Sequence, residues 1–406
     1  MKDDIFRFSD HLSYKDNDLF MEKVPLQSLG NKFQTPIYCY SITQIKKNFN
    51  KLKESFSKIK PLICYAVKAN FNKKIIKTLS GLGAGMDVVS DGELRLSLNN
   101  GVDRKKIVFS GVGKTEREIK YAILRNIKQI NVESEEELSE INSICLNLKK
   151  KINVSLRVNP DVDAETHDKI STGRSEDKFG ISEGEIIKIF KIYKTNKNIK
   201  INGLSIHIGS QIKKLAPFEK AFKKIRGIVL NLRKQGFVCD TLDLGGGMAI
   251  EYNYDSEILK ISDYASLVEK IFSDLNLEII LEPGRYMVGS AGVLISKVVR
   301  IKKGIKKEFL IIDAGMNNLI RPSLYNASHK IIPVKKNLKD KKYDIVGPIC
   351  ETSDVFVKDL KIQEMKKGDF LVICSAGAYS ACMASNYNLR GLAKEILIDG
   401  KKVLQT

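Results

Sequence analysis

The sequence contains a lysine and a run of glycines whose surroundings could support chemistry. Lys68 lies among apolar and small residues in the string 65–70 (YAVKAN). Such neighbours would bury the amine, disfavour its charged form and leave it free to condense with an aldehyde. Gly245 to Gly247 follow an apolar run and could present backbone N–H groups to a phosphate. Each feature also has an ordinary explanation. The aliphatic stem of Lys68 could cover apolar surface, and the three glycines could form a tight turn.

Alternating elements surround these residues. Between Pro36 and about Gly284, short apolar, β-branched runs alternate with amphipathic stretches, which is typical of repeated βα units and a parallel sheet. A Ser or Thr with Glu or Gln three residues later marks several helix starts, at Ser41, Ser90, Thr115, Ser134 and Ser182. Eight strands are expected, at residues 61–67, 86–89, 107–110, 129–132, 153–158, 203–208, 240–244 and 278–282. Eight in succession predict a closed (β/α)8 barrel, which we bound at residues 42–290.

The spacing of apolar residues in the sequence changes after Ala291. Runs with a period of two, separated by turns, predict an antiparallel β domain, and Asp399-Gly400 has the composition of a hairpin turn. The runs lie at residues 293–301, 307–314, 343–347, 354–360, 369–375 and 395–405. The first forty residues show no helical period and could add strands to this domain. We therefore expect an α/β fold with a second, antiparallel domain made of residues 1–41 and 291–406.

The predicted barrel strands end at polar or glycine residues. In a parallel barrel, site residues lie at the carboxyl ends of the strands, and the loops after the last two strands are the usual phosphate site. His207 could instead be a core histidine, and Glu282 could cap a turn before Pro283. The residues expected at this rim are Lys68, Asp87, His207, Ser210, Gly245, Gly246, Gly247, Glu282, Gly284 and Arg285.

The composition excludes several classes of protein. The formal net charge is +20, but the lysines are scattered and lack interleaved aromatics, so solvated faces are a better explanation than a nucleic-acid site. No apolar run is long enough to cross a bilayer, and the first residues resemble no targeting signal. Seven Cys without a CxxC pair favour a reducing compartment over disulfides or zinc. We expect a cytoplasmic protein with neither a metal site nor a nucleic-acid or membrane partner.

Further strings complete a pattern that covers nearly the whole chain. Together with YAVKAN they resemble the alanine-racemase-like, fold-type III pyridoxal-phosphate (PLP) enzymes, and most of all the diaminopimelate decarboxylase family. The stretch 167–173 (HDKISTG) before 178–181 (KFGI) resembles that family more than the ornithine or arginine decarboxylases. The strings are 87–90 (DVVS), 207–211 (HIGSQ), 242–247 (LDLGGG), 282–285 (EPGR), 350–354 (CETSD) and 377–379 (GAY).

The resemblance implies a cofactor site for PLP. Lys68 would hold the cofactor with Asp87 as its neighbour, while His207 would stack on the pyridine ring. Glu282 would pair with the ring nitrogen, because a protonated ring is a deeper sink for electrons. Tyr379 would approach the cofactor and its phosphate. The phosphate itself would be held by Ser210, Gly245, Gly246, Gly247, Gly284 and Arg285.

The resemblance also implies a substrate site shared between two subunits. Arg321 and Tyr325, with Arg285 and Tyr379, would bind the substrate and its carboxylate, for which a guanidinium is well shaped. Cys350 as proton donor and Glu351 as the group that recognises the remote amine would enter the active site of a partner subunit. The enzyme would thus be a homodimer with composite sites. The other cysteines are expected to be inert packing.

The implied reaction is decarboxylation of meso-2,6-diaminopimelate to L-lysine and CO2, the last step of lysine biosynthesis. Decarboxylation of ornithine, arginine or a related basic amino acid is the alternative, since the ring chemistry is the same. A PLP-binding regulatory paralogue would be expected to lack the pair Cys350 and Glu351, which is present. An alanine racemase would share YAVKAN but need a tyrosine base in place of Cys350.

Overall fold

The computed structural model describes residues 10–164, 166–170, 172–174, 176–253, 258–337 and 339–405. The chain divides into two compact units. One contains residues 49–249 and 257–284; the other contains residues 1–48, 250–256 and 285–406. Among the described residues, no helix combines the length and apolarity needed to cross a membrane. Ser171, in one of the strings above, lies outside the described residues.

The first unit is a closed barrel of parallel strands in the order β10-β11-β12-β5-β6-β7-β8-β9, as the alternation predicted. Each expected strand is found, with ends shifted by a few residues. The strands are β5 (Leu62–Ala66), β6 (Gly85–Val88), β7 (Ile107–Phe109), β8 (Gln129–Val132), β9 (Ile152–Arg157), β10 (Ile199–Ser205), β11 (Thr241–Asp243) and β12 (Glu278–Leu281).

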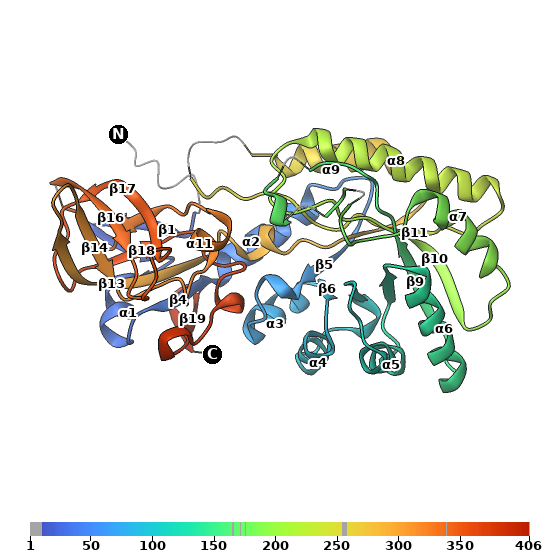
Figure 1. Cartoon of the computed structure of the whole chain (residues 1–406), viewed down its shortest axis with the longest axis horizontal. Helices are drawn as coiled ribbons and strands as arrows, with labels where there is room; N and C mark the ends of the chain where they lie inside the picture. Colours follow the sequence, from blue (N-terminus) through green and yellow to red (C-terminus); the bar gives the residue numbers. More distant parts are fainter. Residues whose placement is uncertain are drawn as a thin grey trace. The chain divides into compact units, whose positions relative to one another are not determined.

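Helices cover the outside of the barrel, and α4, α5 and α6 lie side by side in chain order (Figure 1). Their starts follow the predicted caps: the Ser90 hydroxyl accepts from the Glu93 N–H, and Thr115 forms a capping box with Glu118. The helices of this unit are α3 (Lys73–Gly81), α4 (Asp91–Asn99), α5 (Glu116–Arg125), α6 (Glu135–Leu148), α7 (Glu183–Ile192), α8 (Leu215–Lys234) and α9 (Ile261–Phe272), while α2 (Ile42–Glu54) has residues in both units.

The second unit contains a nine-stranded sheet and a separate, small sheet made of the first three strands of the chain. Its strands are β1 (Leu12–Lys15), β2 (Asp18–Met21), β3 (Val24–Pro25), β4 (Ile37–Ser41), β13 (Gly292–Lys303), β14 (Glu308–Ile312), β15 (Ile331–Pro333), β16 (Asp340–Val346), β17 (Val355–Gln363), β18 (Phe370–Ile373), β19 (Lys394–Asp399) and β20 (Lys402–Gln405). Three short helices accompany them: α1 (Leu26–Lys32), α10 (Arg285–Val288) and α11 (Arg321–Tyr325).

Most strand pairs of this unit are antiparallel, as expected, but two are not. Strand β14 pairs with β16 in parallel, and β4 pairs in parallel with β19. The sequence could not reveal this, because side chains alternate with a period of two in both kinds of sheet. The predicted hairpin is confirmed: β19 and β20 pair antiparallel, and Gly400 has φ +64°. The early strand β4 lies between β13 and β19, so the first forty residues do contribute strands.

Candidate active site

Lys68 lies directly after β5, on a 3-10 turn (Val67–Ala69). Its amine forms an ion pair with Asp87 Oδ2, from the neighbouring strand β6. The Asp87 side chain is fully buried, whereas that of Lys68 is 39% exposed. The expected burial of the amine is therefore wrong, because a carboxylate holds it at the mouth of the barrel. The other carboxylate oxygen, Asp87 Oδ1, is buried and has no hydrogen-bond partner among the described residues.

A network of polar side chains fills the barrel behind this pair. Asn131 donates to Asp243 Oδ2 (2.9 Å) and to Glu282 Oε1 (3.3 Å), and the Ser110 hydroxyl donates to Glu282 Oε1 (3.2 Å). Burial raises the pKa of Glu282 well above its usual range, and the charges of Asp243 and Asp87 raise it further. Burial also raises the pKa of Asp243 to about 6. The two carboxyl groups share a hydrogen bond and so hold a proton between them near neutral pH.

This pair predicts how stability depends on pH. A carboxyl group whose pKa is higher in the folded state makes the fold less stable as the pH rises from its unfolded to its folded pKa. The free energy of unfolding of the cofactor-free protein should thus fall between pH 3.8 and about 6 and beyond, as Asp243 and then Glu282 lose their protons. Glu282→Gln should make the protein more stable at neutral pH by about 1–3 kcal/mol.

Urea unfolding at several pH values measures this effect. Glu278→Gln is the matched control, because Glu278 lies on the same strand, β12, but is half exposed and paired with Lys128 (2.7 Å). The control should retain the wild-type pH profile. A Glu282→Gln profile identical to the wild type would show that no proton is held at this position.

His207 and the glycine loop meet at the same end of the barrel. The Gly246 N–H donates to His207 Nδ1 (3.2 Å), which leaves the ring proton on Nε2. Burial, with the positive charges of Arg157 and Lys68, lowers the pKa of His207 to about 3, so the ring is neutral. Ser210 follows on the same loop, where its N–H donates to the Ile170 carbonyl (3.1 Å).

The glycines are required by close backbone contacts. A Cβ on Gly246 would lie 2.3 Å from the Glu282 carbonyl oxygen, and one on Gly247 would lie 2.6 Å from the Gly209 oxygen. Gly245 has φ +64° and Gly247 has φ +100°. The loops after β10, β11 and β12 therefore pack backbone against backbone. Such a cradle of peptide groups beside Lys68 fits the phosphate of a phosphorylated aldehyde.

This packing makes Gly246→Ala a test of the cradle. The substitution should reduce the free energy of unfolding by about 1–3 kcal/mol and weaken PLP binding, because the methyl group must displace the Glu282 backbone. Gly227→Ala is the control, since nothing lies within 4 Å of its added Cβ in the exposed face of α8. That variant should be neutral or slightly stabilised. Equal thermal stability and PLP affinity of the two variants would contradict the close packing.

Two buried arginines and three tyrosine rings form a cluster in the second unit. Arg285 Nη1 donates to the Tyr252 hydroxyl (2.5 Å), and its guanidinium lies 4.8 Å from the Tyr379 ring centre. Arg321 lies 5.1 Å from the ring of Tyr252 and 5.7 Å from that of Tyr325. Both arginine residues are only 5% exposed. Among the described residues Arg321 has no carboxylate partner, so its charge is available to an acidic ligand.

His329 holds Arg321 in place. Its Nδ1 lies 2.9 Å from the Cys374 carbonyl, so that nitrogen carries the proton, and Nε2 accepts from Arg321 Nε (3.4 Å). Burial and the charge of Arg321 lower the pKa of His329 to about 3, which keeps the imidazole neutral. Sequence reasoning missed His329 and Tyr252. The histidine lies in the string 321–329 with Arg321 and Tyr325, which was the one available signal.

Cys350 and Glu351 lie on the loop between β16 and β17, where both are exposed. The Cys350 N–H donates to Asn388 Oδ1 (3.2 Å), and Glu351 Oε1 accepts from the Tyr387 hydroxyl (2.7 Å). The structure thus joins these two residues to the segment 387–392 rather than to the arginine cluster. Burial raises the pKa of other thiols, for example Cys239 to about 12, as expected of packing residues.

Comparisons with known proteins agree with this geometry. The model of the pyridoxal-dependent decarboxylases, pyridoxal binding domain, matches residues 42–289. The diaminopimelate decarboxylase of Aquifex aeolicus is 44% identical over 397 residues, which cover 98% of this chain and 94% of that protein. The chain belongs to the diaminopimelate decarboxylase family. Another family member, from Neisseria meningitidis, is 46% identical over 95% of this chain and 94% of its own length.

Solved structures of the diaminopimelate decarboxylase family have the same fold. The structure of the M. jannaschii enzyme, in complex with L-lysine, has a TM-score of 0.94 and 37% identity, and the match covers 98% of this chain and 95% of that one. The Helicobacter pylori enzyme, complexed with L-lysine, has a TM-score of 0.90 and 40% identity, and the match covers 94% of this chain and 95% of that one. The fold-class prediction is therefore confirmed.

Proposed function

We propose that this chain uses PLP to decarboxylate meso-2,6-diaminopimelate to L-lysine and CO2. The main support is the assembly of Lys68, Asp87, His207 and Glu282 at one end of the barrel of a chain that aligns almost end to end with diaminopimelate decarboxylases. When bound, PLP supplies an electron sink for the carbanion left by departing CO2.

The barrel residues fit this cofactor. Lys68 holds it, and the partnerless Asp87 oxygen can accept a hydrogen bond from it. The neutral His207 presents an uncharged face for stacking. The phosphate is surrounded by Gly245, Gly246, Gly247, Gly284 and Ser210. The proton shared by Glu282 and Asp243 allows Glu282 to face a ring nitrogen as a donor or, once ionised, as a counter-ion.

The arginine cluster binds the acidic ends of the ligands. Arg321 and Tyr325 hold a substrate carboxylate, while Arg285 and Tyr379 serve the phosphate and the substrate. Arg321→Lys should raise KM for diaminopimelate about 10–100-fold, because a lysine cannot form the two parallel hydrogen bonds of a guanidinium. Steady-state kinetics measures this, with the exposed Arg300→Lys as a control that leaves KM unchanged. An unchanged KM in Arg321→Lys would remove this arginine from the role.

Two subunits complete each site in this proposal. Cys350 of the partner subunit supplies the proton that replaces the lost carboxylate, and Glu351 of the partner subunit binds the remote ammonium group. The support is an apolar surface beside these residues, in which Tyr387 is 44%, Leu389 is 96% and Leu392 is 60% exposed. Such a surface is typical of a protein interface. Sedimentation of the holoenzyme at several concentrations tests the homodimer.

We propose residues 42–290 as the PLP-binding domain and residues 1–41 with 291–406 as the β domain. A cytoplasmic location is proposed from the spacing of the seven cysteines.

The choice of substrate is tested by CO2 release from diaminopimelate, ornithine, arginine and lysine with purified, PLP-loaded protein. Release from meso-diaminopimelate, with lysine as the product, is expected. Faster release from ornithine or arginine would overturn the proposed specificity and leave the cofactor chemistry in place. No release from any of the four would favour a regulatory PLP-binding protein.

A further inference from the structure

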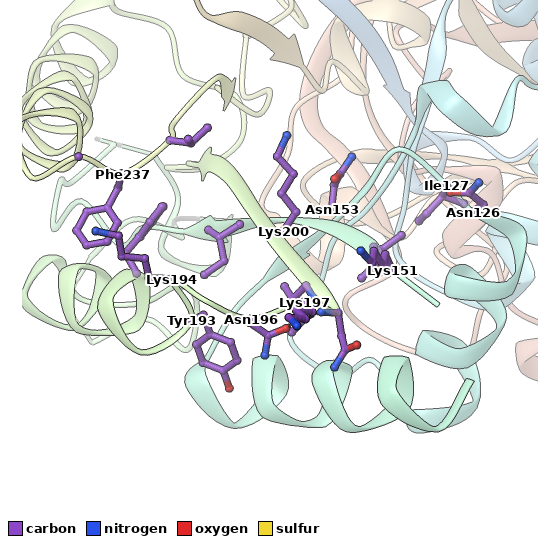
Figure 2. Close-up of a pocket in the computed structure, with 17 residues that line it drawn as sticks. Asn126, Ile127, Lys151, Asn153, Tyr193, Lys194, Asn196, Lys197, Lys200 and Phe237 are labelled. Atoms are coloured by element: carbon purple, nitrogen blue, oxygen red, sulfur yellow. Dashed lines mark hydrogen bonds between the residues drawn. The ribbon is translucent and has the colours of Figure 1, made fainter. Parts of the chain in front are cut away.

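A pocket of about 680 Å³, drawn in Figure 2, opens in the barrel unit. Its walls include Ile152 and Ile199, which begin β9 and β10, whereas the active-site residues follow the carboxyl ends of the strands. Because all barrel strands are parallel, these two ends lie on opposite faces of the barrel. A ligand in this pocket would therefore not touch the reacting groups.

The charged side chains that line the pocket are all positive. Its 17 lining residues include four lysines, Lys151, Lys194, Lys197 and Lys200, and neither aspartate nor glutamate. The lysines come from three places: the residue before β9, the turn after α7, and β10 itself. Nearby Lys128 is neutralised by Glu278 (2.7 Å), but no ion pair involves Lys151, Lys197 or Lys200 among the described residues. Like charges gathered in a concave surface repel one another, and a bound anion would relieve that repulsion.

The pocket is also held in shape by interactions of its own. The Asn196 side chain accepts hydrogen bonds from the N–H groups of Asn198 (2.8 Å) and Ile199 (2.9 Å), which fixes the turn that carries Lys197. Phe190 and Phe237 pack with their ring centres 5.6 Å apart, and Lys194 lies 5.4 Å from the Phe237 ring centre. Figure 2 shows Lys194 beside Phe237 and Lys197 beside Asn196.

We propose that this pocket binds a small anion that carries two or more phosphate groups. A single phosphate offers too little charge for four ammonium groups, whereas a di- or triphosphate could contact several at once. Point-charge contacts from lysine suit phosphate oxygens, and the aromatic pair offers an apolar surface to a base if the ligand is a nucleotide. This site is separate from the proposed decarboxylase activity and does not rest on it.

The test is pyrophosphate binding to the PLP-loaded holoenzyme, in which the phosphate cradle is already filled. Calorimetric titration should give saturable binding that weakens as NaCl is added, because salt screens exposed charges. Saturating pyrophosphate should also raise Tm by about 2–4 °C. The triple variant K151Q/K197Q/K200Q should lose both the heat of binding and the shift in Tm.

A second triple variant separates the pocket from the general positive charge of the chain. K53Q/K77Q/K120Q removes three exposed lysines of the same unit that lie outside the pocket. It should bind pyrophosphate as the wild type does. Equal loss in both triple variants, or unchanged binding in K151Q/K197Q/K200Q, would overturn the proposal, as would the absence of binding to the wild type. ATP in place of pyrophosphate identifies the ligand class: tighter binding indicates a nucleotide, and equal binding indicates phosphates only.

Discussion

Lys68→Ala is expected to lower the rate of diaminopimelate decarboxylation about 10⁴-fold or more. Lys68 is the amine placed at the barrel mouth by its ion pair with Asp87, and in our account it holds the cofactor in covalent linkage. Loss of a group that forms a covalent bond in catalysis costs more than loss of a positioning contact. Turnover of the PLP-saturated variant, measured together with its visible absorption, gives the result.

The control for this variant is Lys77→Ala, an exposed lysine on α3 of the same unit. It should retain wild-type turnover and colour. The circular dichroism spectrum of Lys68→Ala should match that of the wild type, whereas its free energy of unfolding should fall, because the buried Asp87 carboxylate loses its ion-pair partner. A variant that is well folded and still decarboxylates within tenfold of the wild type would refute the role of Lys68.

Cys350→Ala is the second substitution with a large expected effect. It should decrease kcat about 10²–10⁴-fold, because this is the usual contribution of a general acid. Cys350 is exposed, which its proposed role in the site of a partner subunit requires. Cys145→Ala is the control, because Cys145 is buried in α6 and should affect packing but not proton delivery. Unchanged turnover in Cys350→Ala would assign the proton to another group.

Mixing the two inactive variants tests whether the sites are composite. A mixed dimer of Lys68→Ala and Cys350→Ala subunits contains one site with both residues intact. Random exchange of subunits in equal amounts should therefore restore about a quarter of the wild-type turnover. No recovery, with mixed dimers present, would mean that Lys68 and Cys350 act within the same subunit.

Much of the fold could be predicted, because its signals are local. Ser90, Thr115 and their partners mark helix starts within four residues, and the apolar runs between them mark the barrel strands. The pairing of β4 with β19 joins residues more than 350 positions apart, and its parallel direction leaves no trace in the alternation of side chains. The direction of those strands therefore had to come from the structure.

The site could be predicted only in part. The residues that stand in recognisable strings, such as Lys68, Asp87 and Glu282, were found, but the partners of Glu282 were not. Asp243 lies between two leucines and resembles part of an apolar strand, although its side chain points into the polar network with Asn131. The resemblance placed Asp87 beside Lys68, but the apolar residues around Lys68 in the sequence wrongly indicated a buried amine, since its side chain is 39% exposed. Burial and charge at these positions depend on neighbours from other strands, which no local pattern reveals.

Borohydride reduction of the PLP-loaded protein, followed by peptide mass spectrometry, tests the central claim most directly. The account predicts that reduction fixes one cofactor per chain, on the peptide that contains Lys68, and that meso-diaminopimelate added beforehand decreases this labelling. Cofactor fixed on a different lysine, or no labelling of a protein that has been incubated with PLP, would contradict it.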